Sequence, residues 1–464
     1  MDCSDPGAQD FTGGNGGNCY VHLRYVFQGR DGVKRIKAAF TTLGCKVNQD
    51  ETAGMQSLFE AAGFEIVDFD ELADVYIVNT CTVTHLASRK SRQMLRQAKR
   101  RNREALVVAA GCYPQAAPEE LARLKEVDLI VGNSHKPDLV DLVQDNVANK
   151  GRRIVVDALT EFPQLPVSRL SERNRATLKI QDGCQRYCTY CIIPKARGPL
   201  RSMPLADVLA KGRELAAAGF REIVLTGINL TSYGKEKEGG ENLSRVVNSL
   251  AQAVSPVRIR ISSVEPTDFD AELIEAVAAN ANVCKDFHIP LQSGSDGVLK
   301  RMGRKYSAAE FLALADSLKQ RFDRPSFSTD IIVGFPGETD AEFQETLELV
   351  RKVGFCRLHV FRYSPRAGTP AASYKDQVAP EIAGRRSQQL IKLGHVLAKE
   401  FARELIGCNE EMLIEEASTR PGEWVGYGKR YMRIHSSADS GPGSLIRVEI
   451  TGHWGLDLLA RPLV

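Results

Sequence analysis

Three cysteines lie close together in the stretch DGCQRYCTYC, at Cys184, Cys188 and Cys191. Thiolates on one loop are typical metal ligands, and most four-iron clusters are held by four cysteine sulfurs. Three cysteines would leave one iron open for a ligand that is not protein. A structural zinc site, the main alternative, usually has paired Cys-x2-Cys units and four ligands. The spacing therefore favours an iron–sulfur cluster over zinc, and the polar loop makes three merely buried thiols the weakest interpretation.

A second set of cysteines is spread over the first third of the chain. Cys45 follows the apolar run IKAAFTTLG, Cys81 follows VYIVNT, and Cys112 follows ALVVAAG. Such continuously apolar, β-branched runs predict strands of a parallel sheet that is covered on both faces. The carboxyl ends of neighbouring parallel strands share one crevice. We therefore expect these three thiols to converge on a second site.

The elements that would position both sites indicate an α/β protein. Alternating strands and helices predict a parallel-sheet α/β domain over residues 35–150. Six further strand-like runs, separated by helical segments, predict a partial (β/α)6 TIM-like barrel within a central domain over residues 170–400. In such barrels the active site lies at the carboxyl ends of the strands. The triple-cysteine loop follows the first of these strands.

The two ends of the chain have different patterns. The stretch from Pro380 to Ile406 predicts one long helix, and short β-like runs with Gly-rich turns predict a small β-barrel over residues 405–464. Residues 1–34 are rich in Gly and Asn at their start and lack a clear period. We expect them to form an extension without regular structure, and we assign it no function.

Composition indicates the cellular compartment and the broad class of protein. The chain has 464 residues, of which 43% are hydrophobic and 26% charged, and a formal charge of +3, as expected for a soluble protein of several domains. No apolar run approaches the roughly 18 to 20 residues of a membrane helix, and the N-terminus lacks the features of a signal peptide. We expect a cytoplasmic protein without a membrane partner. Among its 11 cysteines, metal ligands and nucleophiles are then more common than disulfides.

The cysteine loop resembles that of the radical S-adenosylmethionine enzymes. The shared features are the Cys-x3-Cys-x2-Cys spacing, an aromatic residue before the last cysteine, here Tyr190, and the position after the first strand of a partial barrel. The resemblance implies that Cys184, Cys188 and Cys191 are catalytic ligands of a 4Fe–4S cluster. Its open iron would bind the amino and carboxylate groups of S-adenosylmethionine, with Tyr190 near the adenine. An external reductant such as flavodoxin or ferredoxin would supply the electron that yields a deoxyadenosyl radical.

The resemblance becomes more specific at the N-terminal cysteines. TLGCKVNQ, VNTCTVT and AAGCYPQ, with IIPKARGPLRS after the radical loop, are similar to the methylthiotransferases. In that family Cys45, Cys81 and Cys112 would hold a second 4Fe–4S cluster, and the C-terminal barrel would be an RNA-binding TRAM domain. The implied chemistry has two stages. One S-adenosylmethionine methylates a sulfur on the second cluster, another generates the radical, and the product gains a methylthio group.

Branches of this family differ in substrate. The run Cys45-Lys46-Val47-Asn48-Gln49, and Thr82-Val83-Thr84 after the second cysteine, are most similar to the branch that modifies tRNA at C2 of N6-threonylcarbamoyladenosine, position 37, beside the anticodon. Isopentenyladenosine in tRNA and an aspartate of a ribosomal protein are the alternative substrates. Asp50 departs from the pattern, which has an aromatic there, and GYGKRYMRI is more basic than expected. A non-catalytic zinc-containing RNA-binding protein is the alternative from another class.

Two groups of cations are candidates for contact with the anticodon stem-loop of tRNA. Residues 89–103 carry eight Lys and Arg without an acidic residue on a predicted helix after Cys81, and we expect its Arg96, Arg100 and Arg101 to bind phosphates. In the terminal barrel, Lys429, Arg430 and Arg433 are interleaved with Tyr427 and Tyr431, a pattern that suits stacking on looped-out bases. A solvated helix face and tyrosines in the barrel core are the respective alternatives.

Polar residues at the ends of the predicted barrel strands are candidates for contact with S-adenosylmethionine. The same side chains could instead make structural hydrogen bonds, and His288 could be a core histidine. Gly227 is the exception, because the missing side chain would leave room for the methionine group. The candidates for cofactor binding are Tyr190, Gly227, Ser262, Glu265, Gln292 and Asp330.

Overall fold

The computed structural model describes residues 28–29, 32–33, 35–149, 151–167 and 174–463. The expectation for residues 1–34 therefore lies almost wholly outside the described residues. Of that region, the short strands β1 (Gln28–Gly29) and β2 (Gly32–Val33) pair antiparallel. Residues 36–464 form a separate unit, which contains all the elements described below.

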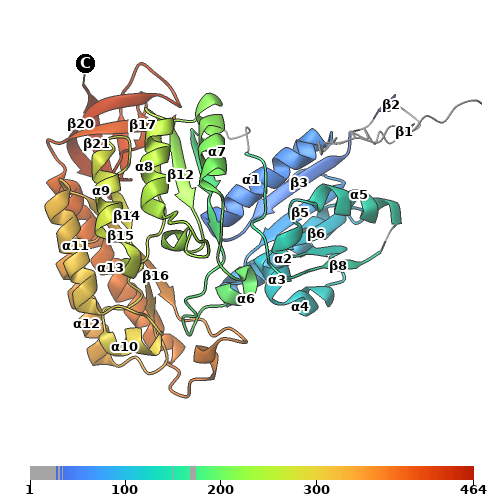
Figure 1. Ribbon diagram of the computed structural model, residues 1–464, viewed down its shortest axis with the longest axis horizontal. Helices are drawn as coiled ribbons and strands as arrows, with labels where there is room; N and C mark the ends of the chain where they lie inside the picture. Colours follow the sequence, from blue (N-terminus) through green and yellow to red (C-terminus); the bar gives the residue numbers. More distant parts are fainter. Residues whose placement is uncertain (1–27, 30–31, 34, 150, 168–173, 464) are drawn as a thin grey trace, which may run out of the picture. The chain divides into compact units, whose positions relative to one another are not determined.

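A six-stranded parallel sheet forms the N-terminal domain, as the sequence predicted (Figure 1). Its strand order is β4-β3-β5-β6-β7-β8. The strands are β3 (Lys37–Thr42), β4 (Glu65–Val67), β5 (Val75–Thr80), β6 (Leu106–Gly111), β7 (Leu129–Val131) and β8 (Arg153–Val155). Every residue of β5 is buried, which explains its apolar run from Val75 to Val78.

Helices cover both faces of this sheet. On one face α1 (Lys46–Ala61) and α5 (Leu139–Asn149) enclose an apolar cluster, and on the other α2 (His85–Arg101) and α4 (Pro118–Ala122) enclose a second. The short α3 (Cys112–Ala116) and η1 (Asn133–His135) lie at the carboxyl edge. Because α1, α2 and α3 begin shortly after β3, β5 and β6, the loops that carry the three N-terminal cysteines all lie at this edge.

The central domain is the predicted partial barrel. Its six parallel strands form two sheets, β13-β12-β9 and β14-β15-β16, which a parallel bridge from Ile259 to Val283 connects. The strands are β9 (Arg175–Lys179), β12 (Glu222–Thr226), β13 (Arg258–Ile261), β14 (Asp286–His288), β15 (Ser326–Val333) and β16 (Arg357–Arg362). They enclose one large apolar core with their flanking helices.

The flanking helices follow the strands in alternation. They are α7 (Leu205–Ala217), α8 (Leu243–Ala253), α9 (Ala271–Ala279), α10 (Asp296–Arg301), α11 (Ala308–Arg321) and α12 (Asp340–Val353), with the short η2 (Leu230–Ser232), η3 (Pro266–Asp268) and η4 (Pro370–Ser373). Both α11 and α12 begin with a capping box, in which Ser307 pairs with Glu310 and Thr339 with Glu342. These caps satisfy backbone N–H groups that the first turn of a helix leaves free.

The C-terminal part consists of a long helix and a closed barrel. The helix α13 (Pro380–Glu404) ends two residues before the predicted position. Five strands then form the predicted small barrel in the order β17-β18-β19-β21-β20. They are β17 (Asn409–Ala417), β18 (Trp424–Tyr427), β19 (Arg433–Ser436), β20 (Leu445–Trp454) and β21 (Asp457–Pro462). In the described part of the chain, no helix has the length and apolarity needed to span a membrane.

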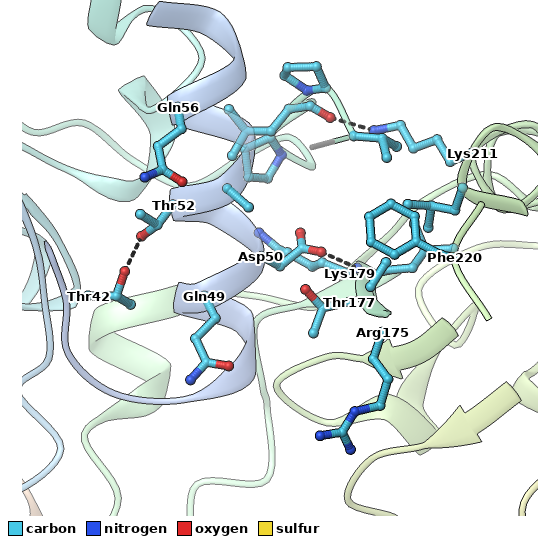
Figure 2. Close-up of a pocket in the computed structure, with 18 of the residues that line it drawn as sticks. Thr42, Gln49, Asp50, Thr52, Gln56, Arg175, Thr177, Lys179, Lys211 and Phe220 are labelled. Carbon is cyan, nitrogen blue, oxygen red and sulfur yellow. Dashed lines mark hydrogen bonds between the residues drawn. The ribbon is translucent and has the colours of Figure 1, made fainter. Parts of the chain in front are cut away.

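A cavity of 490 Å³ lies where α1 faces β9 and α7 (Figure 2). Asp50 of α1 lines it and accepts a hydrogen bond from the backbone N–H of Lys179 at 3.3 Å. Burial raises the pKa of Asp50 to about 6, the nearby Glu51 adds to the effect, and Lys179 and Thr177 oppose it. A carboxylate thus occupies the position where the sequence pattern led us to expect an aromatic ring.

Candidate active site

Main-chain hydrogen bonds hold the loop DGCQRYCTYC against the central domain. The short ribbon of β10 (Gln181–Asp182) and β11 (Arg201–Ser202) closes its base. The N–H of Cys184 donates to Gly198 O at 3.1 Å, and that of Thr189 donates to Met302 O at 3.0 Å. The Thr189 hydroxyl also donates to Arg301 O at 2.9 Å. The loop is therefore fixed both at its base and in its middle.

The thiols of this loop influence one another. Desolvation raises the pKa of the Cys191 thiol to about 12, and the neighbouring Cys188 and Cys184 contribute to the increase. Three thiols whose negative forms repel one another are costly to ionise together without a cation. The same arrangement suits thiolates that bind a positively charged metal centre.

Arg304 is a neighbour of this loop that sequence reasoning missed. Its Nη1 donates to the Cys188 sulfur at 3.4 Å, and its Nε donates to the Tyr306 hydroxyl at 3.2 Å. Its other Nη forms an ion pair with Glu265, which the sequence nominated for cofactor binding. Glu265 also lies 4.0 Å from Nε of Arg186, within the loop. A single arginine in GRKYS matched no motif, so no sequence signal distinguished it.

Three other predicted cofactor residues lie at carboxyl ends of the barrel strands or on the cysteine loop itself. The ring of Tyr190 packs edge-on against Phe335, with 6.4 Å between centroids, and burial raises the pKa of Tyr190 well above its ordinary value. Gln292 has a left-handed backbone, φ 64°, and its N–H donates to Asp330 O at 2.8 Å. Ser262 follows β13 directly. The structure thus brings these residues to the edge that carries the cysteine loop.

Gly227 has a packing reason for lacking a side chain. A Cβ atom at this position would lie 3.0 Å from both Cβ and Oε1 of Gln181. Oε1 of Gln181 is held in place because it accepts the Asn229 N–H at 2.8 Å. The close approach of Gln181 is a reason for the glycine, and the room for the methionine group stays a prediction.

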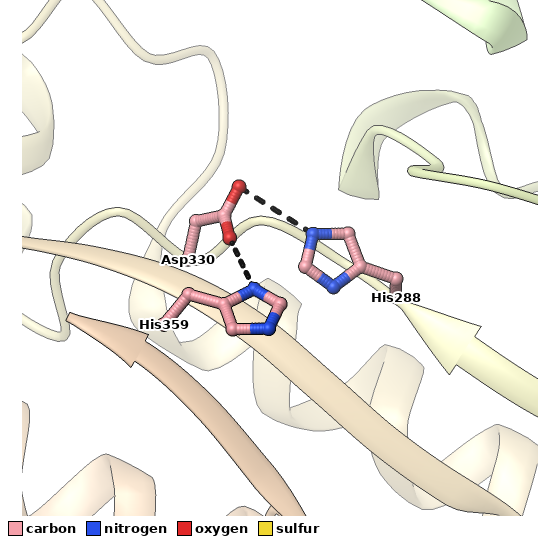
Figure 3. A group of neighbouring side chains, drawn as sticks. All are labelled: His288, Asp330 and His359. Carbon is pink, nitrogen blue, oxygen red and sulfur yellow. Dashed lines mark hydrogen bonds and ion pairs between the residues drawn. The ribbon is translucent and has the colours of Figure 1, made fainter. Parts of the chain in front are cut away.

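Asp330 holds two histidines inside the central domain (Figure 3). Its Oδ1 lies 3.0 Å from Nδ1 of His359, and its Oδ2 lies 3.4 Å from Nε2 of His288. Burial alone would raise the pKa of Asp330, but the hydrogen bonds with His288 and His359 outweigh it and lower the pKa below its ordinary value. The three residues come from the adjacent strands β14, β15 and β16. Asp330, nominated for cofactor contact, therefore has both carboxylate oxygens engaged by histidines.

The three N-terminal cysteines converge as the strand pattern predicted. Burial raises the pKa of Cys81 to about 11, and Cys112 and Cys45 both contribute. Gly44, which precedes Cys45, has a φ of +109°, and a Cβ there would lie 3.2 Å from the Cys81 sulfur. A glycine is needed here because the loops of Cys45 and Cys81 approach so closely.

The spacing of the sulfurs distinguishes two kinds of metal centre. A tetrahedral zinc with Zn–S bonds of about 2.3 Å requires sulfurs about 3.8 Å apart. Within the described ranges, neither cysteine triad brings its three ligand atoms within 4.8 Å of one another; the His288, Asp330 and His359 group is the one that does. In each triad, at least one pair of ligand sulfurs is therefore further apart than the sulfurs of a tetrahedral zinc site.

Arg197 connects the segment after the radical loop to the N-terminal cysteines. It ends α6 (Ile193–Arg197), which begins two residues after Cys191, and its Nε donates to the Cys112 sulfur at 3.2 Å. Both of its Nη atoms contact Glu51 of α1, and Nη1 also contacts Asp182 of β10. The stretch IIPKARGPLRS carries a family resemblance, but no sequence signal distinguishes this arginine from its neighbours.

A second connection lies at the loop after Cys81. Arg366, in the segment after β16, donates to the Thr82 hydroxyl at 2.6 Å and to the Ser88 hydroxyl at 3.2 Å. The N–H of His85 donates to the Ser364 hydroxyl at 3.2 Å. The loops of Cys81 and Cys112 are therefore both held by arginines of the central domain.

The basic helix α2 has an exposed and a structural set of cations. Arg101 belongs to the structural set, because it donates to Phe69 O at 2.5 Å and forms an ion pair with Asp70. Arg96 is exposed and lies 4.0 Å from Glu126. The phosphate contact predicted for Arg101 stays a prediction, and Arg101 already has these partners within the chain. The exposed cations of this helix are Arg89, Lys90, Arg96 and Arg100.

The basic and aromatic segment of the terminal barrel packs on the central domain. Lys429 donates to Ala281 O at 3.1 Å, and Arg430 donates to Arg324 O at 2.8 Å and to Glu410 at 2.9 Å. The charged groups of Lys429 and Arg430 thus have partners within the chain, and their RNA-binding role stays a prediction.

Neighbouring side chains in this segment are engaged as well. The ring of Tyr431 lies under the guanidinium groups of Arg260 at 4.5 Å and Arg357 at 4.8 Å, and next to Tyr427. Arg433 forms ion pairs with Asp457 at 3.3 Å and Glu416 at 3.2 Å. The tyrosines therefore stack on arginines of this chain rather than presenting free rings for bases.

The partial barrel with its cysteine loop defines a radical S-adenosylmethionine enzyme. Residues 178–350 match the Radical SAM superfamily, and residues 37–132 match Uncharacterized protein family UPF0004. The solved structure of the radical S-adenosylmethionine methyltransferase TsrM from Kitasatospora setae is similar in fold, with a TM-score of 0.56 and 14% identity, over 84% of this chain and 81% of that one.

Two curated relatives extend over nearly the whole chain. Threonylcarbamoyladenosine tRNA methylthiotransferase MtaB of Bacillus subtilis is 40% identical over 89% of this chain and 93% of its own. A tRNA-2-methylthio-N(6)-dimethylallyladenosine synthase of Carboxydothermus hydrogenoformans is 34% identical over 88% and 95%. The chain belongs to the family of radical S-adenosylmethionine tRNA methylthiotransferases. This confirms the enzyme class that the cysteine patterns predicted.

Proposed function

We propose that this enzyme adds a methylthio group to C2 of N6-threonylcarbamoyladenosine at position 37 of tRNA. The observation that carries the proposal is the presence of two open cysteine triads, which Arg197 joins within one unit. The substrate choice rests on the higher identity to the threonylcarbamoyladenosine enzyme, 40% against 34% for the dimethylallyladenosine enzyme.

The two triads have separate roles in this proposal. Cys184, Cys188 and Cys191 hold one 4Fe–4S cluster, and Cys45, Cys81 and Cys112 hold the other, so each cluster keeps an iron without a protein ligand. When bound, the first cluster with S-adenosylmethionine supplies a deoxyadenosyl radical, and the second carries the sulfur that is transferred. The loop hydrogen bonds keep the first three sulfurs in place, and Arg304 offsets their negative charge.

The remaining parts of the site position the cofactor and the RNA. Tyr190 and Gln292, at the same edge as the cysteine loop, are our candidates for contact with S-adenosylmethionine. Residues 35–150, 170–400 and 405–464 would act as the auxiliary-cluster, radical and TRAM domains. An external flavodoxin or ferredoxin would supply electrons.

The anticodon stem-loop would contact the exposed cations of α2, which begins four residues after Cys81. The proposal favours Arg89, Lys90, Arg96 and Arg100, which are exposed, over Arg101, Lys429 and Arg430, which already have partners within the chain. Phosphate contacts of this kind make binding depend on salt, because they release counterions.

Nucleoside mass spectrometry tests the substrate. We expect tRNA from cells that lack this protein to lose 2-methylthio-N6-threonylcarbamoyladenosine and to regain it when the gene is restored. In a competition assay with purified protein, threonylcarbamoylated tRNA should be modified and isopentenylated tRNA should not. Preferential modification of isopentenylated tRNA, or of a ribosomal protein, would reject this substrate while leaving the family assignment intact.

A further inference from the structure

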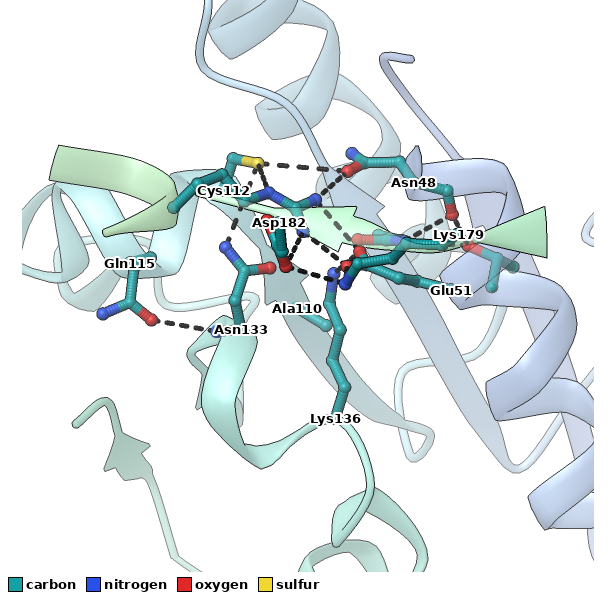
Figure 4. A network of polar contacts seen from close by, with 12 residues as sticks. Asn48, Glu51, Ala110, Cys112, Gln115, Asn133, Lys136, Lys179 and Asp182 are labelled. Carbon is teal, nitrogen blue, oxygen red and sulfur yellow. Dashed lines mark hydrogen bonds and ion pairs between the residues drawn. The ribbon is translucent and has the colours of Figure 1, made fainter. Parts of the chain in front are cut away.

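A buried network of charges lies between the two cysteine sites (Figure 4). Arg197, Glu51, Asp182 and Lys136 are fully buried, and Lys179 is 3% exposed. Nη2 of Arg197 donates to Glu51 Oε2 at 3.0 Å, and Nη1 donates to Asp182 Oδ2 at 3.3 Å. Nζ of Lys179 lies 2.7 Å from both Glu51 Oε1 and Asp182 Oδ2. Lys136 forms a further ion pair with Glu51.

The cations in this network outnumber the carboxylates. Arg197, Lys179 and Lys136 face Glu51 and Asp182, which leaves one positive charge in excess. Two further charged residues border the network: Arg201 pairs with Asp182 at 3.5 Å, and Asp50 accepts a hydrogen bond from the Lys179 backbone. They add one positive and one negative charge, so the network keeps its excess of one positive charge. Buried charge without compensation is costly. The network therefore suits a negatively charged neighbour.

Arg197 is the cation that faces the N-terminal cysteines. Its Nε donates to the Cys112 sulfur at 3.2 Å, and its Nη2 donates to Asn48 Oδ1 at 2.5 Å. The Asn48 amide in turn donates to Leu43 O at 2.7 Å and to Thr80 O at 3.1 Å. Leu43 lies two residues before Cys45, and Thr80 directly precedes Cys81. The guanidinium thus contacts one cysteine directly and the other two loops through a single amide.

The other end of Arg197 belongs to the radical loop. It ends the short helix that follows Cys191, and Asn133 of the N-terminal domain donates to the backbone O of the adjacent Ala196 at 2.8 Å. Arg201 also donates to Arg197 O at 2.9 Å. Both the main chain and the side chain of this helix are therefore fixed between the two cysteine triads.

We propose that Arg197 is a positioning residue for the N-terminal cluster, which raises the reduction potential of that cluster and fixes it relative to the radical loop. The inference rests on the proposed function, in which Cys45, Cys81 and Cys112 hold iron. Hydrogen bonds to cluster sulfurs and nearby positive charge favour the reduced, more negative form and so raise its potential. The Nε–H to Cys112 contact supplies both effects.

The test uses full-length protein in which Cys184, Cys188 and Cys191 are replaced by Ala, so that the N-terminal cluster alone remains. Arg197→Gln removes the donor and the charge, and Arg197→Lys keeps the charge. Arg201→Gln is the matched control, because Arg201 is a buried arginine that also pairs with Asp182 and supports the same helix through Arg197 O. Among the described residues, its hydrogen bonds and ion pairs include no cysteine. Iron content and the midpoint potential, from a redox titration followed by electron paramagnetic resonance, are the readouts.

We expect Arg197→Gln to lower the midpoint potential, Arg197→Lys to lower it less, and Arg201→Gln to change it least. Loss of iron from Arg197→Gln, with iron retained in the other two, would equally support a positioning role. Equal potentials in Arg197→Gln and Arg201→Gln would overturn the inference. Circular dichroism checks the fold: if both Arg197 variants unfold while Arg201→Gln does not, Arg197 is a stability residue and the inference is wrong. Absence of iron from the parent protein would instead reject the proposed function.

Discussion

Arg304 donates to the sulfur of Cys188 across 3.4 Å. Its counterpart in the N-terminal domain is Arg197, which donates to the sulfur of Cys112 across 3.2 Å. Each cysteine triad therefore has one sulfur that accepts a hydrogen bond from a largely buried arginine. Both arginines come from the central domain, and each also pairs with a carboxylate, Arg304 with Glu265 and Arg197 with Glu51.

The first prediction concerns Arg304. Arg304→Gln should reduce deoxyadenosine formation by about tenfold or more, because a charge-assisted hydrogen bond is worth about 1.5 to 3 kcal/mol. Its loss also leaves Glu265 with a more distant partner, Arg186 at 4.0 Å. Deoxyadenosine is measured by liquid chromatography after anaerobic reduction. Arg301→Gln is the control, because Arg301 pairs with Glu342 and its side chain contacts no sulfur. Equal losses in both variants would show that Arg304 has no special relation to Cys188.

The second prediction concerns the metal content. Anaerobically reconstituted protein should contain about eight irons, and replacing either triad by alanine should remove about four. Inductively coupled plasma analysis and visible absorption measure this directly. Stoichiometric zinc without iron–sulfur absorption would instead support the alternative of a zinc-containing RNA-binding protein.

The third prediction concerns Asp50 and pH. The pKa of Asp50 is raised to about 6 in the folded protein, against about 3.9 in an unfolded chain, so its protonated form is favoured by folding. Protonated Asp50 therefore contributes fully to the stability of the folded protein below its unfolded pKa, and this contribution is lost as pH rises through about 6. Asp50→Asn should therefore be more stable than the parent at pH 8, by about 1 to 3 kcal/mol, since each pKa unit corresponds to about 1.4 kcal/mol.

Thermal unfolding between pH 5 and pH 8 checks this dependence. The difference in stability between Asp50→Asn and the parent should increase as pH rises and become constant above about pH 7. Asp141→Asn, on the exposed side of α5, is the control and should show no such increase. If the difference in stability between Asp50→Asn and the parent does not change with pH, the surroundings of Asp50 do not raise its pKa.

The fourth prediction concerns RNA binding by α2. Replacing Arg89, Lys90, Arg96 and Arg100 together by Gln should weaken tRNA binding and reduce its salt dependence, by about one in the logarithmic slope for each phosphate that is no longer neutralised. Filter binding at several salt concentrations measures both. Arg101→Gln should leave the slope unchanged but lower stability, because Arg101 contacts Phe69 and Asp70. An unchanged slope in the fourfold variant would make this helix an ordinary solvated face.

The sequence predicted the elements and both cysteine triads because both have strong local patterns. Cys45, Cys81 and Cys112 each follow an apolar strand, and parallel strands share their carboxyl edge, so convergence followed from topology. Arg197 and Arg304 had no comparable signal, because a buried arginine between domains depends on contacts far apart in the sequence. Tyr431 and Lys429 had a signal that fits two different structures. Interleaved aromatic and basic residues suit RNA, but the same chemistry forms cation–π contacts within the chain, as with Arg260.

The last prediction separates the roles of the two triads. Cys188→Ala removes a ligand of the cluster that would bind S-adenosylmethionine, so deoxyadenosine formation should be abolished, and no methylthio product can follow. Cys81→Ala damages the N-terminal site alone, where the sulfur would be carried, so this variant should still form deoxyadenosine while methylthio product disappears.

Both products are quantified in one anaerobic assay, after circular dichroism has shown that each variant is folded. Cys284→Ala is the matched control, since Cys284 is a buried cysteine that belongs to neither triad. It should retain both activities. The two activities could also be linked through the structure, because Arg197 and Arg366 of the central domain contact the loops of Cys112 and Cys81. If Cys81→Ala still yields normal methylthio product, the N-terminal triad does not carry the sulfur. If it also loses deoxyadenosine formation, the two sites are coupled through these arginines and do not work independently.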